Sequence, residues 1–262
     1  MLPIVNPGPA PCKICGAAAP LMGVVDFHKS CLQREGKTLP MSGIPIYYRR
    51  CPQCSFVFTD AFDDWSPGAF ARRLYNADYA VVDPEYAEDR PATSVKAFEA
   101  LFPKPPGGTR VLDYGGGSGK FAELLAKQTG VSVTSYDPFA APSRQPSGTY
   151  EVVTCFEVLE HAVQPAESVA ALVGLVARDG VLLMTTLLQN ADFAANGLGW
   201  WYIAPRNGHI SIHSPASLAL LFKKVGFTVV TISGYHLAFK AISPLIAHLV
   251  KKVPAEAAKK KA

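Results

Sequence analysis

The chain has 262 residues, enough for one large domain or two small ones, and its 49% hydrophobic and 18% charged residues are typical of a soluble globular protein. Much of the net charge of +4 comes from lysines in the last dozen residues, so the body is nearly neutral and we expect no nucleic-acid partner. No apolar stretch reaches the roughly 20 residues of a membrane-spanning helix, and the N-terminus lacks the pattern of a signal peptide. The sequence therefore predicts a cytoplasmic protein without a transmembrane segment.

Two Cys-x-x-Cys pairs stand in the first part of the chain. Cysteines stay reduced in the cytoplasm, and two such pairs supply the four thiolates of a closed, structural zinc site. We therefore expect residues 1–60 to form a small module that Zn²⁺ stabilises. A redox-active pair, buried free thiols and Cys31 as a substitute ligand are the alternatives. The expected ligands are Cys12, Cys15, Cys51 and Cys54.

Residues 61–105 form a connector rich in aromatic and acidic side chains. It includes a predicted helix from about Ala92 to Leu101, which dense proline and glycine then end. Such side chains can cap a cleft over a polar ligand, or they can simply pack between two domains.

A strand, a glycine loop and a helix follow one another directly after this connector. Val111 and Leu112 close the apolar strand, four glycines follow within seven residues, and apolar residues then recur at helical spacing. This pattern predicts the ligand-binding corner of an open α/β sheet. Lys120 stands where a dinucleotide-binding fingerprint needs its third glycine, which disfavours a nicotinamide-dependent oxidoreductase. Asp113 is well placed for an ammonium group, and S-adenosylmethionine (SAM) carries one.

The segment DYGGGSG, residues 113–119, resembles the first motif of class I SAM-dependent methyltransferases. Asp137 ends the next predicted strand, 24 residues after Asp113, where that family places an acid on the ribose hydroxyls. Residues 150–161 resemble the family's fourth strand and the loop after it. In related enzymes an aromatic residue of the N-terminal segment also reaches the methionine end of SAM. The resemblance therefore implies SAM as cofactor, bound by Asp113, Gly115, Gly116, Gly117, Gly119, Asp137, Pro138, Cys155, Phe156, Glu157 and Tyr79.

The fold that we expect is α/β, with a Rossmann-like doubly wound sheet over residues 106–242. Strands alternate with helices, which is typical of a parallel sheet. The segment 138–149 is too short and proline-rich for the family's third strand and helix, so we expect that part to be lost or rudimentary. A C-terminal helix and a lysine-rich tail take up residues 243–262. The strands are expected near 110–114, 131–136, 150–156 and 181–188, the helices near 120–129, 165–177 and 214–227, and a final hairpin at 228–242.

Some sugar-modifying methyltransferases also begin with a cysteine zinc module and continue into a SAM-binding domain. This resemblance implies a saccharide, a nucleotide-sugar or a related small molecule as acceptor. Trp200, Trp201 and Tyr202 lie in a long insertion after the last parallel strand. They are candidates for a platform under a sugar ring, and the alternative is a hydrophobic plug.

His209 is the first candidate for the base that removes the acceptor's proton, and His161 is the second. Similar enzymes use a histidine before the serine-capped helix for the acceptor, but the tyrosine and glutamate that tend to precede it are replaced here by Asn207 and Gly208. His161 could instead be a structural hydrogen-bonding residue. The sequence therefore predicts a methyltransferase acting on a hydroxyl. The alternatives are C-methylation of a ketosugar and a non-catalytic SAM-binding or zinc scaffold.

Overall fold

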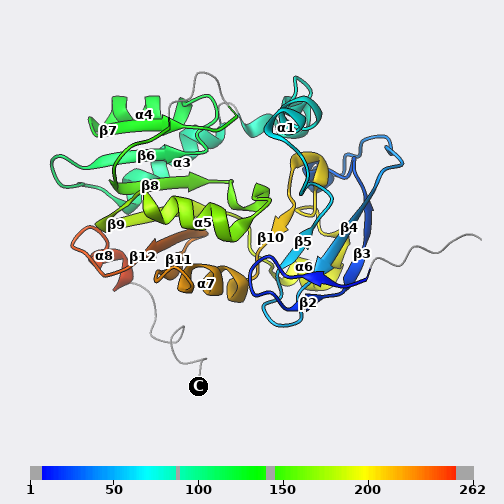
Figure 1. Cartoon of the computed structure of the whole chain (residues 1–262). Coiled ribbons are helices and arrows are strands. Elements are labelled where there is room, and N and C mark those ends of the chain that lie inside the picture. Colours follow the sequence, from blue (N-terminus) through cyan, green and yellow to red (C-terminus); the bar gives the residue numbers. More distant parts are fainter. Residues whose placement is uncertain (1–7, 87–88, 140–144, 252–262) are drawn as a thin grey trace, which may run out of the picture. The chain divides into compact units, whose positions relative to one another are not determined.

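The computed structural model describes residues 8–86, 89–139 and 145–251, and the chain folds into two compact units (Figure 1). Unit 1 consists of Met1–Asp83, Leu159–Ser168 and Leu187–Leu221. Unit 2 consists of Pro84–Val158, Val169–Thr186 and Phe222–Ala262. Each unit therefore combines segments that are distant in sequence, and the domain boundaries inferred from the sequence stay predictions.

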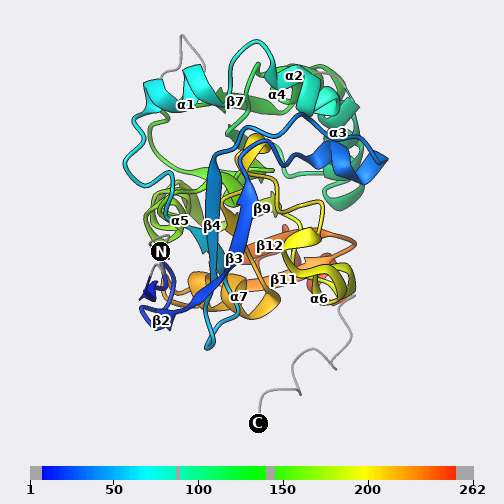
Figure 2. The same cartoon turned by 90° about the vertical axis from the view of Figure 1, so that its right-hand side faces the viewer.

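Unit 1 is built on antiparallel strands, of which β3 and β4 lie side by side in Figure 2. Its four-stranded sheet has the order β10-β5-β4-β3, and β1 pairs with β2 separately. Ser211 pairs with Phe58, so a strand from late in the chain completes a sheet of the N-terminal segment. The strands are β1 (Ala10–Pro11), β2 (Ala18–Ala19), β3 (Leu21–Asp26), β4 (Pro45–Arg50), β5 (Val57–Thr59) and β10 (Ser211–Ile212).

The core of unit 1 is aromatic, and its buried members include Tyr48, Phe62, Phe70, Trp200 and Tyr202. Each buried side chain of this size contributes roughly 1.5–3 kcal/mol through the hydrophobic effect, which suits a unit with short elements. The helices are α1 (Pro67–Arg73), α2 (Tyr79–Val82) and α6 (Ala191–Asn196), with 3-10 turns η1 (Cys31–Glu35), η3 (Leu159–His161), η4 (Gly197–Gly199) and η5 (Pro205–Asn207).

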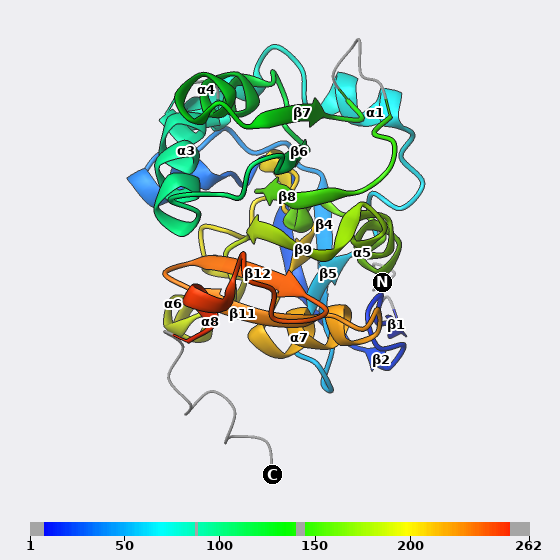
Figure 3. The same cartoon turned by 90° about the vertical axis from the view of Figure 1, so that its left-hand side faces the viewer.

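Unit 2 carries a six-stranded sheet of order β11-β12-β9-β8-β6-β7, which Figure 3 shows from β7 down to β11. Neighbouring strands are parallel among β9, β8, β6 and β7, whereas β12 is antiparallel to β9 and β11 is antiparallel to β12. The predicted α/β class with a doubly wound sheet is therefore confirmed. The strands are β6 (Arg110–Tyr114), β7 (Ser132–Tyr136), β8 (Tyr150–Phe156), β9 (Val176–Thr185), β11 (Thr228–Ile232) and β12 (Tyr235–Phe239).

Helices cover the parallel strands of unit 2 with apolar faces. Phe98 of α3 and Phe121 and Leu125 of α4 share one buried cluster with Val111 and Val152 of the sheet. Gly119 and Gly130 flank α4, and both have the left-handed backbone conformation that glycine adopts without strain. The other helices are α3 (Asp89–Leu101), α4 (Lys120–Thr129), α8 (Ala247–Val250) and the 3-10 turn η2 (Pro84–Tyr86) in unit 2, and α5 (Pro165–Gly174) and α7 (Pro215–Lys223), each of which begins in unit 1 and ends in unit 2.

The structure departs from the predicted boundaries at β9, which begins at Val176 and not near Val181. Its pairing with β8 shifts register between Tyr150 and Val152. A side chain at Gly180 would lie 2.8 Å from the carbonyl oxygen of Glu151, so glycine permits this irregular start.

The expected loss of the third strand is seen in the described part of the chain. No helix or strand is described between residues 137 and 150, and β7 forms the edge of the sheet. Residues 140–144 lie outside the described ranges, as do residues 252–262 of the predicted lysine-rich tail. Within the described ranges, every helix falls short of the length and hydrophobicity needed to cross a lipid bilayer.

Candidate functional site

The parallel strands of unit 2 contain a topological switch point between β6 and β8. The chain runs from β6 to β7 on one side and then returns to form β8 on the other side of β6. Open α/β sheets bind ligands beyond the carboxyl ends of the strands at such a point. Asp113, Asp137 and Glu157 lie at the carboxyl ends of β6, β7 and β8. The fold thus gathers three residues that the sequence placed in the cofactor site.

The glycine loop after β6 is held against the end of β7. The N–H groups of Gly115 and Gly116 donate to the carbonyl oxygen of Tyr136 at 2.7 and 3.2 Å. A Cβ at Gly116 would lie 2.2 Å from Oδ2 of Asp113 and 2.4 Å from Oγ of Ser135, and Gly115 has a φ of +76°. Larger residues would therefore displace the loop or the carboxylate behind it.

Asp137 braces the same loop from the end of β7. One of its carboxylate oxygens accepts from the N–H of Gly117 at 2.9 Å, and the other accepts from the N–H of Phe139 at 2.7 Å. Gly117 and Gly119 both have positive φ angles, so the loop turns back toward α4. Pro138, which follows the carboxylate, is exposed.

Asp113 is a buried carboxylate, with 3% of its surface exposed. The hydroxyls of Thr154 and Ser135 donate to it at 3.1 and 3.4 Å. Burial raises the pKa of Asp113 to about 7, against the two hydrogen bonds that lower it, and the charge of Asp137 adds a smaller increase. A cationic group bound at the loop would therefore lower the pKa of Asp113 and stabilise its charged form.

Glu157 stands at the end of β8 in a strained conformation. It has a φ of +52°, which is rare for a residue with a side chain and costs roughly 1–3 kcal/mol. Its N–H donates to the carbonyl oxygen of Thr185 at 3.1 Å, which holds the turn against β9. Before it, Cys155 is fully buried and Phe156 packs edge-on against Phe121. Only the backbone of Cys155 is thus suited to line a ligand site.

Unit 1 brings both predicted histidines together with an acid. The turn η3 carries Glu160 and His161, and the N–H of Ile210 donates to the carbonyl oxygen of Glu160 at 2.9 Å, which sets this turn beside His209. A carboxylate oxygen of Glu160 and a ring nitrogen of each histidine lie within 4.8 Å of one another. The ring centroids of His161 and His209 are 5.2 Å apart.

Backbone carbonyls orient both imidazole rings. Nδ1 of His161 lies 3.1 Å from the carbonyl oxygen of Gly208, and Nδ1 of His209 lies 2.9 Å from that of Tyr202. Both carbonyls accept, so each Nδ1 carries the proton. A Cβ at Gly208 would lie 2.8 Å from Nδ1 of His161, so this glycine permits the contact. The Tyr202 hydroxyl donates to Glu160 at 2.8 Å and accepts from the N–H of Leu187 at 3.0 Å.

The sequence interpretation missed Glu160, although it named the histidine next to it. Glu160 is fully buried. The sequence shows only that it stands next to His161 after a predicted strand, and this does not reveal that the acid is buried. It also missed that the Tyr202 hydroxyl contacts this acid. Lys29, whose pKa burial lowers to about 8, donates to the carbonyls of Trp200 and Ile203 and so holds the loop that carries Tyr202.

The other predicted aromatic residues lie in unit 1 as well. Tyr79 is largely buried, with its hydroxyl 3.4 Å from the carbonyl oxygen of Asn207. Trp200 is only 1% exposed and packs against Phe193, as a core residue does. Trp201 is half-buried, with the guanidinium of Arg34 5.3 Å above its ring. The roles of these residues toward SAM or an acceptor stay predictions.

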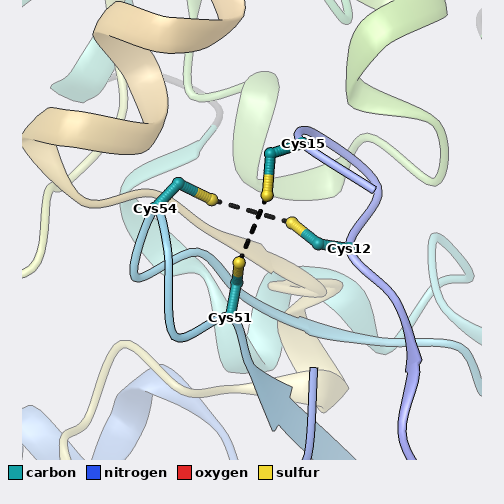
Figure 4. Close-up of side chains that lie close together, drawn as sticks. All are labelled: Cys12, Cys15, Cys51 and Cys54. Atoms are coloured by element: carbon teal, nitrogen blue, oxygen red, sulfur yellow. Dashed lines mark hydrogen bonds between the residues drawn. The ribbon is translucent and has the colours of Figure 1, made fainter. Parts of the chain in front are cut away.

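The four predicted cysteine ligands converge in unit 1, as Figure 4 shows. Their sulfur atoms all lie within 4.8 Å of one another, with 3.3 Å between Cys15 and Cys51 and 3.7 Å between Cys12 and Cys54. Four sulfurs at about 2.3 Å from a tetrahedral Zn²⁺ lie about 3.8 Å apart, so the donor set fits this ion.

Each cysteine pair sits in a tight turn that ends in a left-handed residue. Gly16 follows the first pair with a φ of +79°, and Ser55 follows the second with a φ of +59°. The N–H of each donates to the carbonyl oxygen of the first cysteine in its pair, at 2.9 and 3.0 Å. The two turns are therefore alike, which is why both pairs present their sulfurs in the same way.

Residues 86–232, more than half of the chain, match a family model described as a methyltransferase domain. The chain belongs to this methyltransferase family. The match begins next to the start of unit 2 and covers the glycine loop, Asp137 and Glu157. The methyltransferase family inferred from the motifs is thereby confirmed.

Curated relatives include the ubiquinone biosynthesis O-methyltransferases of Burkholderia pseudomallei and Burkholderia mallei. Each is 37% identical to this chain over 126 residues, which are 44% of the chain and 53% of the relative. The chain thus spans about half the length of the curated relatives that it matches.

Solved structures of methyltransferases also resemble the chain at low identity. An O-methyltransferase family protein from Burkholderia thailandensis has a TM-score of 0.47 at 17% identity, covering 66% of this chain and 62% of the other. The plantazolicin methyltransferase BpumL in complex with SAH has a TM-score of 0.47 at 17% identity, covering 75% and 90%.

Proposed function

We propose that the chain transfers a methyl group from SAM to a hydroxyl oxygen of a small molecule. The observation that carries this proposal is the switch point of unit 2, where a glycine loop and the acids Asp113, Asp137 and Glu157 meet at one sheet edge. The relatives named as O-methyltransferases support oxygen as the methylated atom.

Each residue that the sequence predicts for the cofactor site has a proposed role. The ammonium group of SAM pairs with Asp113, and the ribose hydroxyls bind Asp137. The loop from Gly115 to Gly119 admits the cofactor close to its backbone, and Pro138, Cys155 and Phe156 line the site with Glu157. Tyr79 covers the methionine end. SAM supplies an electrophilic methyl group on a sulfonium.

The chain itself must align the acceptor and take its proton. The acceptor oxygen forms a bond to the methyl carbon while the carbon–sulfur bond breaks and its electrons stay on sulfur. We propose His209 as the first candidate for accepting the hydroxyl proton and His161 as the second. The two rings lie next to each other, with their Nδ1 protons held by carbonyls.

Two lines of support favour different classes of acceptor. The zinc-module resemblance favours a saccharide or nucleotide-sugar, for which the half-buried Trp201 would offer a ring face, with the buried Trp200 and Tyr202 packed against it. The curated relatives are named for ubiquinone biosynthesis, whose O-methylation favours a ring hydroxyl. Transfer from methyl-deuterated SAM to a panel of sugars and phenols, read by mass spectrometry, distinguishes these two. A product methylated on carbon would support C-methylation, and tight SAM binding with no product from any acceptor would support a non-catalytic scaffold.

Binding of SAM by unit 2 is tested with Gly116→Ala. The added Cβ would displace Asp113 or Ser135, and such overpacking costs about 1–3 kcal/mol, which corresponds to roughly fivefold to 150-fold in affinity. Calorimetry with SAM measures this loss. Gly107→Ala is the matched control, because a Cβ at Gly107 meets nothing within 4 Å. Equal SAM affinity in the Gly116→Ala variant and the wild type would contradict the proposed cofactor site.

His209→Asn is expected to slow methyl transfer by about 100-fold or more and to leave SAM affinity unchanged, because the loss of a base affects the acceptor's proton only. Turnover and calorimetry are measured on the same sample. His248→Asn serves as control, since His248 is exposed and its ring contacts the carbonyl oxygen of Leu101 in unit 2. Unchanged turnover in His209→Asn would remove His209 from the reaction.

A further inference from the structure

Glu160 is a buried acid that lies close to two imidazoles, and the three side chains form a group of potential metal ligands. Its side chain is 0% exposed, and burial of a carboxylate is costly unless a cation compensates it. The Tyr202 hydroxyl donates to one oxygen of Glu160 and so fixes the orientation of the carboxylate. One carboxylate oxygen of Glu160 and one ring nitrogen of each histidine lie within 4.8 Å of one another, as the ligand atoms of a single ion would.

The two rings are oriented as metal-binding histidines are. Each Nδ1 carries its proton toward a backbone carbonyl, of Gly208 or of Tyr202, so the lone pair of each ring lies on Nε2. Metal-bound histidines almost always donate their other N–H in this way, and the bound carboxylate is itself hydrogen-bonded. Here Tyr202 serves twice, with its carbonyl on His209 and its hydroxyl on Glu160.

We propose that Glu160, His161 and His209 bind one divalent transition-metal ion. Two imidazole nitrogens and one carboxylate oxygen suit Zn²⁺, Mn²⁺ or Fe²⁺ and leave positions open for water or a substrate oxygen. This donor set differs from the four thiolates of the cysteine cluster, which close their site. The two groups therefore select ions by different chemistry.

An ion at this cluster has a consequence that rests on the proposed function. A divalent metal lowers the pKa of a coordinated hydroxyl, so the acceptor would ionise on the metal. His209 and His161 would then hold the ion and would not take the proton themselves. Metal binding itself involves residues of unit 1 alone and is measured without SAM or acceptor.

The experiment uses the full chain loaded with zinc. The total metal content of the protein is measured by mass spectrometry. Mn²⁺ is then added, and electron paramagnetic resonance measures how much of it binds. Thiolates retain zinc against Mn²⁺, because Mn²⁺ is the weakest binder of the divalent series. The expected result is a second site that takes up one zinc or one Mn²⁺ per chain. Glu160→Gln and His209→Asn should weaken Mn²⁺ binding by about 100-fold, while the exposed control His248→Asn binds like the wild type.

Tyr202→Phe tests the hydrogen bond that orients the acid. It keeps the ring and the backbone carbonyl but removes the hydroxyl, so Mn²⁺ binding should weaken by about 10-fold to 100-fold. The proposal is overturned if the wild type holds neither a second zinc nor Mn²⁺, or if Glu160→Gln and His209→Asn retain the second zinc or Mn²⁺ as the wild type does. Either failure leaves methyl transfer by metal-free histidines intact, and a chain that binds the ion but transfers no methyl group contradicts only the proposed function.

Discussion

Replacing Cys51 and Cys54 with serine is expected to remove the zinc ion that we propose for the cysteine cluster and to unfold the cysteine-rich part of unit 1. Structural zinc sites contribute about 10–16 kcal/mol of binding free energy, which is comparable to the 5–15 kcal/mol that stabilises a typical domain. Unit 1 has short strands and relies on a core of aromatic residues. Loss of the ion should therefore abolish its cooperative unfolding transition or lower its midpoint strongly.

The contacts around the second cysteine pair explain why the damage should spread through unit 1. The N–H of Cys51 donates to the carbonyl oxygen of Phe56, and the Ser214 hydroxyl donates to the carbonyl oxygen of Cys54 at 2.7 Å. Phe56 stacks on Phe58 of β5 with ring centroids 5.5 Å apart. The cysteine turn thus anchors β5 and the segment that follows β10.

Calorimetric unfolding with and without a chelator, combined with metal analysis, measures this effect. Cys155→Ala is the matched control, because Cys155 is a buried cysteine of unit 2 outside the cluster. The control should keep its zinc and respond to the chelator as the wild type does. A double serine variant with unchanged zinc content and unchanged unfolding would show that the cysteines are ordinary core residues.

The sequence predicted the elements of unit 2 well because their signals are local. The glycine loop between β6 and α4 marks the end of the strand and the start of the helix. The limits of β6, α4 and β8 agree with the prediction. The strand β10 was not foreseen, since it pairs with Phe58 and Val57 from more than 150 residues earlier in the chain. Two residues that pair over such a distance leave no periodic pattern for sequence reasoning.

The site in unit 1 shows a second limit of sequence reasoning. Asn207 and Gly208 looked like losses, because similar enzymes carry a tyrosine and a glutamate there. In the structure the Asn207 side chain accepts from the N–H of Cys31 at 2.9 Å and donates to the carbonyl oxygen of Val82 at 3.0 Å. Gly208 lets His161 approach its carbonyl. The two replacements therefore build the loop that brings the histidines together.

Asp113→Asn is expected to stabilise the SAM-free protein above pH 7 and to weaken SAM binding. The pKa of Asp113 rises from 3.8 to about 7 on folding, mainly through burial, so the native state binds this proton more tightly than the unfolded state. Its contribution to stability is thus full below pH 4 and is lost as the pH rises toward 7 and above. At roughly 1.4 kcal/mol per pKa unit, the shift corresponds to up to about 4 kcal/mol that the neutral asparagine would not lose.

Urea unfolding of both proteins at pH 5 and pH 8 tests the sign of this effect. The stability gain of Asp113→Asn over the wild type should be larger at pH 8, where the buried aspartate is charged. Asp192→Asn, which removes an exposed carboxylate from unit 1, corrects for the general effect of one charge. A variant less stable than the wild type at both pH values would mean that the hydrogen bonds from Thr154 and Ser135 outweigh the cost of burial.

The same substitution should weaken SAM binding by at least about tenfold, since a hydrogen bond to a charged group contributes about 1.5–3 kcal/mol. Opposite effects on stability and on affinity would be informative together. A carboxylate that lowers the stability of the free protein and raises its affinity for a cationic ligand serves the ligand and not the fold. Glu157, with its positive φ at the end of the neighbouring strand, fits the same interpretation. The buried charge of Asp113 and the backbone strain of Glu157 would then both lie where the bound cofactor offsets their cost.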